Sequence, residues 1–272
     1  VGSETCIRDS YYSAYLSAEN LYVISVPYNP RVRDSILIYP IDVFLRWPYI
    51  YATTQDMPTD SFVVIDISSE PHRTIGKCEI GGLGWGIYVN GNYAYIACDE
   101  AGLKIVDVSD PYHPSVIGHY ATPGIATNVF VKDNFAYVSA DTAGLRIIDV
   151  SNPSNPFEVA YYKTPGQASS IIVDRNYAYI ADGTCGLRII DVSDPLNPFE
   201  VGFHDTPGYA MDLYVKNNLV FLADFKGGFR IFENLLLPPD IEESTTPRES
   251  ITDNDILTED IATLKFNLPQ KS

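Results

Sequence analysis

Aspartates that recur along the chain are the first residues whose type and spacing could do chemistry. Four of them follow the predicted second strands of successive repeats, namely Asp99, Asp141, Asp182 and Asp224. Calcium needs several hard oxygen ligands that converge on one point. One carboxylate from each repeat, spread around a ring, is a poor cage for an ion. We therefore expect these aspartates to lie at the rim of a ring, as candidate binding residues and not as a metal site.

A second aspartate series consists of Asp107, Asp149 and Asp191, each of which precedes the sequence Val-Ser-(Asp or Asn)-Pro. Asp and Ser side chains bond to nearby backbone N–H groups in turns. This pattern favours a structural role in a turn over metal binding.

Catalysis by a nucleophilic triad needs Ser or Cys, His and a carboxylate that converge. The histidines are scattered, and we expect surface positions for them: His72, His113, His119 and His204. The sequence contains no Gly-X-Ser-X-Gly and no His-Glu-X-X-His motif. The glycine-rich segment 81–86 precedes no predicted helix, so it indicates a turn and not a phosphate-binding loop. We predict no catalytic residue, no cofactor and no enzymatic activity.

Trp85 is the one large side chain at a position where other repeats have Thr127, Ser169 and Met211. This position starts a predicted innermost strand, near the mouth of a central channel. An aromatic side chain there could line a pocket for a carbohydrate or another small ligand. The interpretation that we favour is that it fills an irregular gap beside the shorter first repeats.

The elements that must position these residues come from a repeat. The segment at residues 102–111 reads GLKIVDVSDP and returns as GLRIIDVSNP and GLRIIDVSDP, each copy 42 residues after the last. Each repeat contains four short strand-like segments separated by turn signals, for example around Asn134, Gly144 and Pro153. No stretch shows the 3.6-residue period of a helix. The chain is therefore predicted to be all-β.

A four-stranded unit of this length is the size of one β-propeller blade. Packing such units radially buries both faces of each sheet, which explains consecutive apolar pairs such as Ile105-Val106 and Ile147-Ile148. A linear β-solenoid is the alternative, but its coils are usually shorter and lack a four-stranded meander.

The repeats resemble the LVIVD family, through LKIVDVSDP, LRIIDVSNP, LRIIDVSDP and a weaker FVVIDISSEP at residues 62–71. The resemblance covers roughly residues 41–234. It implies a β-propeller on surface or secreted proteins of bacteria or archaea, without a known reaction. The WD40 type is not supported, because no repeat begins with Gly-His or ends with Trp-Asp.

The repeat length predicts six blades, with a degenerate first blade. Residues 18–25 align with the second strand at residues 174–181, yet only about 15 residues separate them from the next blade. The last copy lacks a fourth strand, and residues 4–7 stand where one is missing. We therefore expect an N-terminal strand to close the last blade, because closure leaves no unpaired edge.

Composition divides the chain into a propeller at residues 1–237 and an acidic, flexible tail or linker at residues 238–272. The net charge of −17 argues against nucleic acid and against anionic membrane surfaces as partners. The sequence contains no apolar run of about 18 residues or more, so it predicts no membrane insertion. Most cysteine pairs would lie blades apart, so free thiols are expected, and only Cys78 with Cys98 could bridge adjacent blades.

These observations predict a non-catalytic surface or secreted repeat module that acts as a scaffold or protein-binding platform. A protein partner is expected, and the extracellular, cell-surface or periplasmic location follows mainly from the family resemblance. Two alternatives stay open. One is a carbohydrate or small-ligand binder at the channel mouth, and the other is a propeller hydrolase or lyase.

Overall fold

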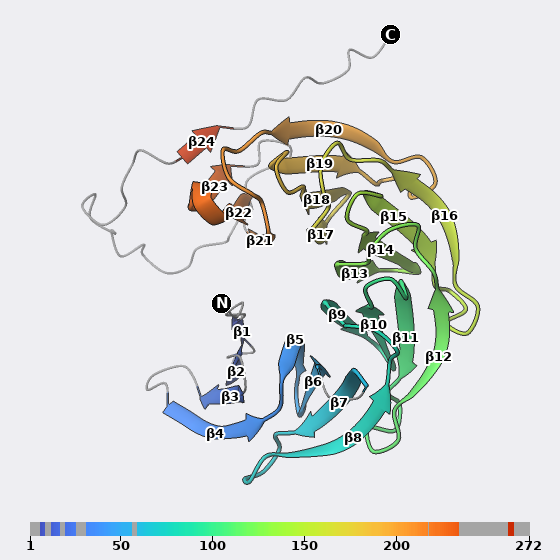
Figure 1. Cartoon of the computed structure of the whole chain (residues 1–272), viewed down its shortest axis with the longest axis vertical. Helices are drawn as coiled ribbons and strands as arrows, with labels where there is room; N and C mark the ends of the chain where they lie inside the picture. Colours follow the sequence, from blue (N-terminus) through green and yellow to red (C-terminus); the bar gives the residue numbers. More distant parts are fainter. Residues whose placement is uncertain are drawn as a thin grey trace, which may run out of the picture.

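The computed structural model describes residues 6–8, 12–16, 20–25, 31–55, 59–216, 218–233 and 261–263. These residues form 24 β-strands and one short 3-10 helix, so the described part of the chain is all-β. The strands form six sheets of four strands each, which follow one another around a common centre (Figure 1). None of the described residues forms a helix with the length and apolar character that crossing a membrane requires.

The first sheet contains β1 (Cys6–Arg8), β2 (Tyr12–Leu16), β3 (Asn20–Ser25) and β4 (Arg31–Leu37). The second contains β5 (Pro40–Arg46), β6 (Tyr49–Thr54), β7 (Ser61–Asp66) and β8 (Arg73–Glu79). The third contains β9 (Gly86–Asn90), β10 (Tyr93–Ala97), β11 (Leu103–Asp107) and β12 (Ser115–Tyr120).

The fourth sheet contains β13 (Asn128–Lys132), β14 (Phe135–Ser139), β15 (Leu145–Asp149) and β16 (Phe157–Tyr162). The fifth contains β17 (Ser170–Asp174), β18 (Tyr177–Ala181), β19 (Leu187–Asp191) and β20 (Phe199–His204). The sixth contains β21 (Asp212–Lys216), β22 (Leu219–Ala223), β23 (Phe229–Glu233) and β24 (Ile261–Thr263), with the 3-10 helix η1 (Phe225–Gly227) before β23.

The first strand of each sheet is the innermost, and successive innermost strands contact one another from β1 and β5 to β21. The third strands of the third, fourth and fifth sheets carry the repeated Leu-X-Ile-(Ile or Val)-Asp sequence and are buried on both faces. Leu145 and Ile147 pack toward the fifth sheet, whereas Ile148 packs toward the third. The apolar core therefore lies between sheets, and this explains why these strands do not alternate between apolar and polar residues.

The turns after the third strands confirm the structural role predicted for the second aspartate series. The Oδ1 atoms of Asp107, Asp149 and Asp191 accept the N–H groups of Ser109, Ser151 and Ser193, each at 2.8 Å. Each carboxylate thereby closes the turn that follows its strand.

The predicted N-terminal closure of the last sheet is wrong. Strand β1 pairs with β2 in the first sheet, and β24 pairs with β23 as the fourth strand of the sixth sheet. The β23–β24 pair is parallel, whereas the other strand pairs of the six sheets are antiparallel. Apart from Ile261–Thr263, the predicted tail at residues 238–272 lies outside the described residues.

The predicted degenerate first blade also needs correction. Residues 20–25 are the third strand of a four-stranded sheet, not the second. The β3–β4 pairing shifts register between Val23 and Ile24, as the pairing of third with fourth strand does in the second to fifth sheets. This assignment removes the apparent shortage of residues before the second sheet.

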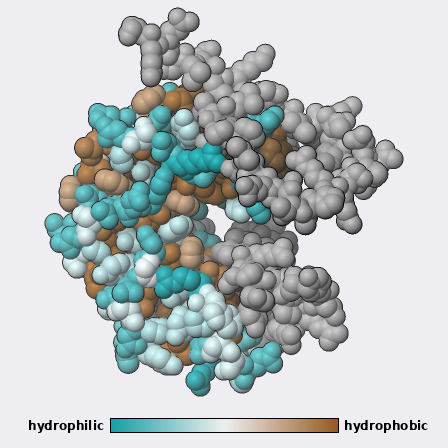
Figure 2. Space-filling model, turned by 180° about the vertical axis from the view of Figure 1, so that it is seen from behind, coloured by the Kyte–Doolittle hydropathy of each residue, from teal (hydrophilic) through white to brown (hydrophobic). Residues whose placement is uncertain are grey.

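Seen from behind, hydrophilic and hydrophobic residues are interspersed over the described part of the ring (Figure 2). The thiols of Cys78, Cys98 and Cys185 are unbridged. Cys78 and Cys98 pack in the same apolar cluster between the second and third sheets, and burial raises their pKa values to about 11 and about 12.

Candidate functional site

The four aspartates predicted at the rim occupy two different positions. Asp99 and Asp141 have positive φ angles of 47° and 43° and form isolated bridges to the next sheet, as Gly183 does. Asp182 and Asp224 stand one residue earlier in the repeat, where Cys98 and Ala140 stand in the preceding sheets. The four carboxylates therefore do not form one equivalent ring.

Asp182 and Asp224 are fully buried and hold the Thr-Pro-Gly turns. Asp224 accepts the Thr206 hydroxyl at 2.6 Å and the Gly208 N–H at 3.1 Å, while Asp182 accepts the Gly166 N–H at 2.8 Å. Burial raises the pKa of Asp182, and the Thr164 hydroxyl, the Gly166 N–H and Arg188 oppose this rise. These contacts assign both residues a structural task.

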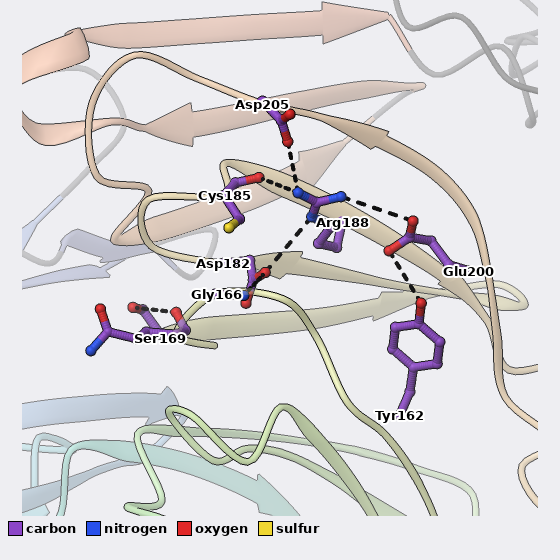
Figure 3. Close-up of polar contacts among 9 residues, drawn as sticks. Tyr162, Gly166, Ser169, Asp182, Cys185, Arg188, Glu200 and Asp205 are labelled. Atoms are coloured by element: carbon purple, nitrogen blue, oxygen red, sulfur yellow. Dashed lines mark hydrogen bonds and ion pairs between the residues drawn. The ribbon is translucent and has the colours of Figure 1, made fainter.

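Arg188 is the centre of the polar network around Asp182 (Figure 3). Its guanidinium lies 2.7 Å from Asp205 Oδ1, 3.7 Å from Asp182 Oδ2 and 3.9 Å from Glu200 Oε1. It also donates to the Cys185 carbonyl at 3.0 Å. A cation that faces three carboxylates is balanced where it lies, so the network fastens elements of the fifth sheet to one another.

The same network connects neighbouring sheets. Tyr162 of the fourth sheet donates to Glu200 Oε2 of the fifth at 3.4 Å, beside Arg188. One repeat earlier, Tyr120 donates to Glu158 Oε2 at 3.3 Å, and Arg146 lies 3.3 Å from Glu158 Oε1. The repetition supports a role in holding sheets together.

Asp42 is a perturbed carboxylate that sequence reasoning did not single out. It lies on the innermost strand β5, where its Oδ2 accepts the Ile87 N–H of the next sheet at 2.9 Å. Burial raises its pKa to about 7, the N–H groups of Ile87 and Val43 oppose the rise, and Asp212 adds to it. The sequence did contain a signal for this residue. Asp42 aligns with Asn128, which shows a charged residue at a position on an innermost strand.

Trp85 is 48% exposed, and its backbone N–H bonds to the Ala97 carbonyl at 2.9 Å. It precedes β9, at the start of an innermost strand as predicted. The expectation of surface histidines is wrong for His72, which is buried. Within the described ranges, no three or more His, Cys, Asp or Glu side chains gather where they could hold a metal ion.

One face of the sixth sheet is an exposed apolar surface that the sequence did not reveal. Phe229 is 61% exposed, although Leu187 and Leu145, its equivalents in the two preceding sheets, are 0% exposed. Tyr214 on β21 is 57% exposed. A groove of about 350 Å³ on this face is lined by Asp212, Leu213, Tyr214, Lys216, Phe221, Ala223 and Phe229. We call these residues the sixth-sheet face.

The fold is similar to that of two solved structures. One is the computationally designed Ika8 protein, with a TM-score of 0.65 and 11% identity over 85% of this chain and 72% of that chain. The other is a functionally unknown protein from Desulfotomaculum acetoxidans DSM 771, with a TM-score of 0.68 and 14% identity over 85% of this chain and 82% of that one. At these identities the likeness shows the fold alone.

No curated protein matches the chain. The family model described as LVIVD repeat matches residues 81–122, 123–164, 165–206 and 207–232, which is more than half of the 272 residues. The match begins at the third sheet, although the second sheet has the same four-stranded form. On this evidence, the chain belongs to the family of LVIVD repeat proteins.

Proposed function

We propose that this chain is a non-catalytic repeat module that binds a protein partner through the sixth-sheet face. The observation that carries the proposal is the exposure of Tyr214 and Phe229 at positions whose equivalents in other sheets contact the next sheet. Large exposed aromatic side chains in one groove are typical of protein interaction surfaces. The surface or secreted location that the family resemblance implies belongs to this proposal.

The chemistry of the ring supports binding over catalysis. Asp182 and Asp224 hold turns, Arg188 and Arg146 hold neighbouring sheets, and Asp42 holds a backbone N–H group of the next sheet. Each of these groups has a structural partner, so none of them is set apart as an acid, a base or a nucleophile. A hydrolase or lyase would need an acid and a base that are free to act together on a substrate.

The proposal predicts that partner capture depends on the sixth-sheet face. The double variant Tyr214→Asp, Phe229→Asp should lose at least about tenfold of a partner captured by cross-linking in the extracellular fraction of the source cells, because two charges enter an apolar contact. The matched control is Phe157→Asp, Phe199→Asp, which changes two exposed aromatic residues on other sheets. Quantitative mass spectrometry compares the three proteins. Equal recovery with all of them would refute the proposal.

A carbohydrate or small-ligand site at Trp85 is the second candidate function, and the exposure of that indole favours it. Aromatic rings at 48% exposure can stack on a sugar face. The candidate predicts glycan-array binding that Trp85→Ser abolishes while the melting temperature stays unchanged. A stability loss without any glycan binding in the unmodified protein would instead make Trp85 a packing residue.

A further inference from the structure

The innermost strand of the sixth sheet repeats the sequence pattern of the innermost strand of the second sheet. Strand β5 carries Asp42, Phe44 and Arg46 at alternate positions, and β21 carries Asp212, Tyr214 and Lys216 at the equivalent ones. Alternate residues of a strand lie on the same side of the sheet. Each sheet therefore presents an acidic, an aromatic and a basic side chain in the same order on one face.

In the second sheet these three residues hold the third sheet. Asp42 Oδ2 accepts the Ile87 N–H at 2.9 Å. Phe44 packs edge-on against Tyr88, with ring centroids 5.2 Å apart. Arg46 donates to the carbonyl of Gly91, in the turn between β9 and β10, at 2.6 Å. One hairpin of the neighbouring sheet is thus held at its strand start, its centre and its turn.

The same contacts recur where other sheets have these residue types. Lys132, which aligns with Arg46, donates to the Arg175 carbonyl in the corresponding turn of the next sheet. Tyr88, which aligns with Phe44, packs against Phe130 of the fourth sheet at a centroid distance of 4.7 Å. A basic and an aromatic residue at these positions therefore face the next hairpin along the ring.

On the sixth sheet the three residues line an exposed groove. Asp212 accepts the Ser170 hydroxyl at 2.7 Å from the preceding sheet and the adjacent Leu213 N–H at 2.9 Å. Tyr214 is 57% exposed, and Lys216 is exposed. The first sheet is at the other end of the arc and contacts β5 through β1 and β2 (Figure 1). Its place is therefore beside the second sheet.

We propose that the sixth-sheet face holds a blade-like β-sheet of a partner polypeptide, whose first hairpin binds as residues 86–97 bind to the second sheet. Asp212 would accept a backbone N–H of the first strand, Tyr214 would pack on an aromatic or aliphatic side chain, and Lys216 would donate to a turn carbonyl. This inference rests on the proposed function and names the chemistry of its partner. The face continues the series of sheet-to-sheet interfaces already present, which favours a sheet over an extended peptide or a small ligand.

A backbone-cyclised peptide of residues 86–97 is the probe, because its two-residue Gly91-Asn92 turn, with a positive φ at Gly91, favours a hairpin and NMR can verify that it folds. We expect saturable binding to the full chain by calorimetry. Tyr214→Ala and Lys216→Met should each weaken it by about tenfold, the ratio that corresponds to one lost anchor. Lys226→Met and Phe157→Ala are matched controls at exposed positions outside the groove and should bind as the unmodified protein does.

Two results of the binding experiment would overturn the inference. One is the absence of binding by a hairpin that NMR shows to be folded, and the other is equal binding by all variants. Loss of partner capture by Tyr214→Asp, Phe229→Asp together with no hairpin binding would leave the proposed function intact and refute only the blade-like partner. Protection of Tyr214 in the isolated chain would assign the groove to the chain's own residues and would also refute it.

Discussion

Replacing Arg188 with Met should lower the free energy of unfolding by about 3 kcal/mol, the largest loss we expect from a single polar side chain. The variant keeps an unbranched apolar stem but removes the cation that balances buried Asp182 and faces Glu200 and Asp205. Breaking a buried ion pair by removing one partner leaves an uncompensated charge in a poorly solvated place. Urea unfolding of the full chain measures the difference.

The control for this prediction is Arg73→Met, since Arg73 is exposed on an outer strand and should change stability by no more than about 0.5 kcal/mol. The double variant Asp182→Ala, Arg188→Met tests the cause. In the fourth sheet, Ala140 stands at the position equivalent to Asp182, so the repeat accepts alanine there. Removing both charges should therefore recover part of the lost free energy of unfolding. A loss below about 1 kcal/mol for Arg188→Met would show that the network does not fasten the sheets.

Asp42→Asn should remove a pH-dependent loss of stability. The pKa of Asp42 is about 7 in the folded chain, against an ordinary value of 3.8. Below the ordinary value both states are protonated, so the residue has no effect. Between the two values the unfolded chain releases the proton while the folded chain keeps it, and stability falls as the pH rises. Above about pH 7 the penalty is constant.

The side chain is only half-buried by surface exposure, so we expect a penalty on the order of 2 kcal/mol at pH 8, less than the full pKa difference implies. Asn keeps an oxygen that accepts the Ile87 N–H. Unfolding at pH 4, 5.5 and 8 should therefore show a smaller decline for Asp42→Asn than for the unmodified protein. Glu233→Gln, at an exposed position, is the matched control. Parallel pH curves for all three proteins would contradict the prediction.

The regular part of this fold could be predicted from the sequence. The repeated Leu-X-Ile-(Ile or Val)-Asp strand needs apolar residues on both faces because it lies between two neighbouring sheets. The Asp-X-Ser turns were predictable for the same local reason, since the carboxylate of Asp149 accepts an N–H only two residues away. Both features depend on interactions within one repeat or between identical repeats.

The ends of the chain could not be predicted in this way. Second and third strands are both short and buried at consecutive positions, so the identity of residues 20–25 depends on the register shift at Val23 and Ile24, which no sequence pattern marks. Strand β24 consists of three residues within a polar segment and pairs in parallel with β23. Its pairing depends on the free edge that β23 offers, and not on an apolar pattern in its own sequence.

The site residues show the same division. Asp99 and Asp182 end strands that look alike, yet one backbone has a positive φ and the other does not, and this one-residue difference separates a turn residue from a buried acceptor. The roles of Asp42 and Asp212 depend on groups in neighbouring sheets. Their role becomes visible only when the Ile87 N–H and the Ser170 hydroxyl are placed beside them.

Hydroxyl-radical footprinting of the full chain tests most directly whether the sixth-sheet face is uncovered, because it compares exposed residues of that face with buried residues of the fifth sheet. We expect rapid oxidation of Tyr214 and Phe229, which are exposed, and slow oxidation of Tyr179 and Leu187, a tyrosine and a leucine that are buried in the fifth sheet. Addition of the cyclised hairpin should slow the first pair and leave the second unchanged. Slow oxidation of all four residues in the isolated chain would contradict an uncovered sixth-sheet face.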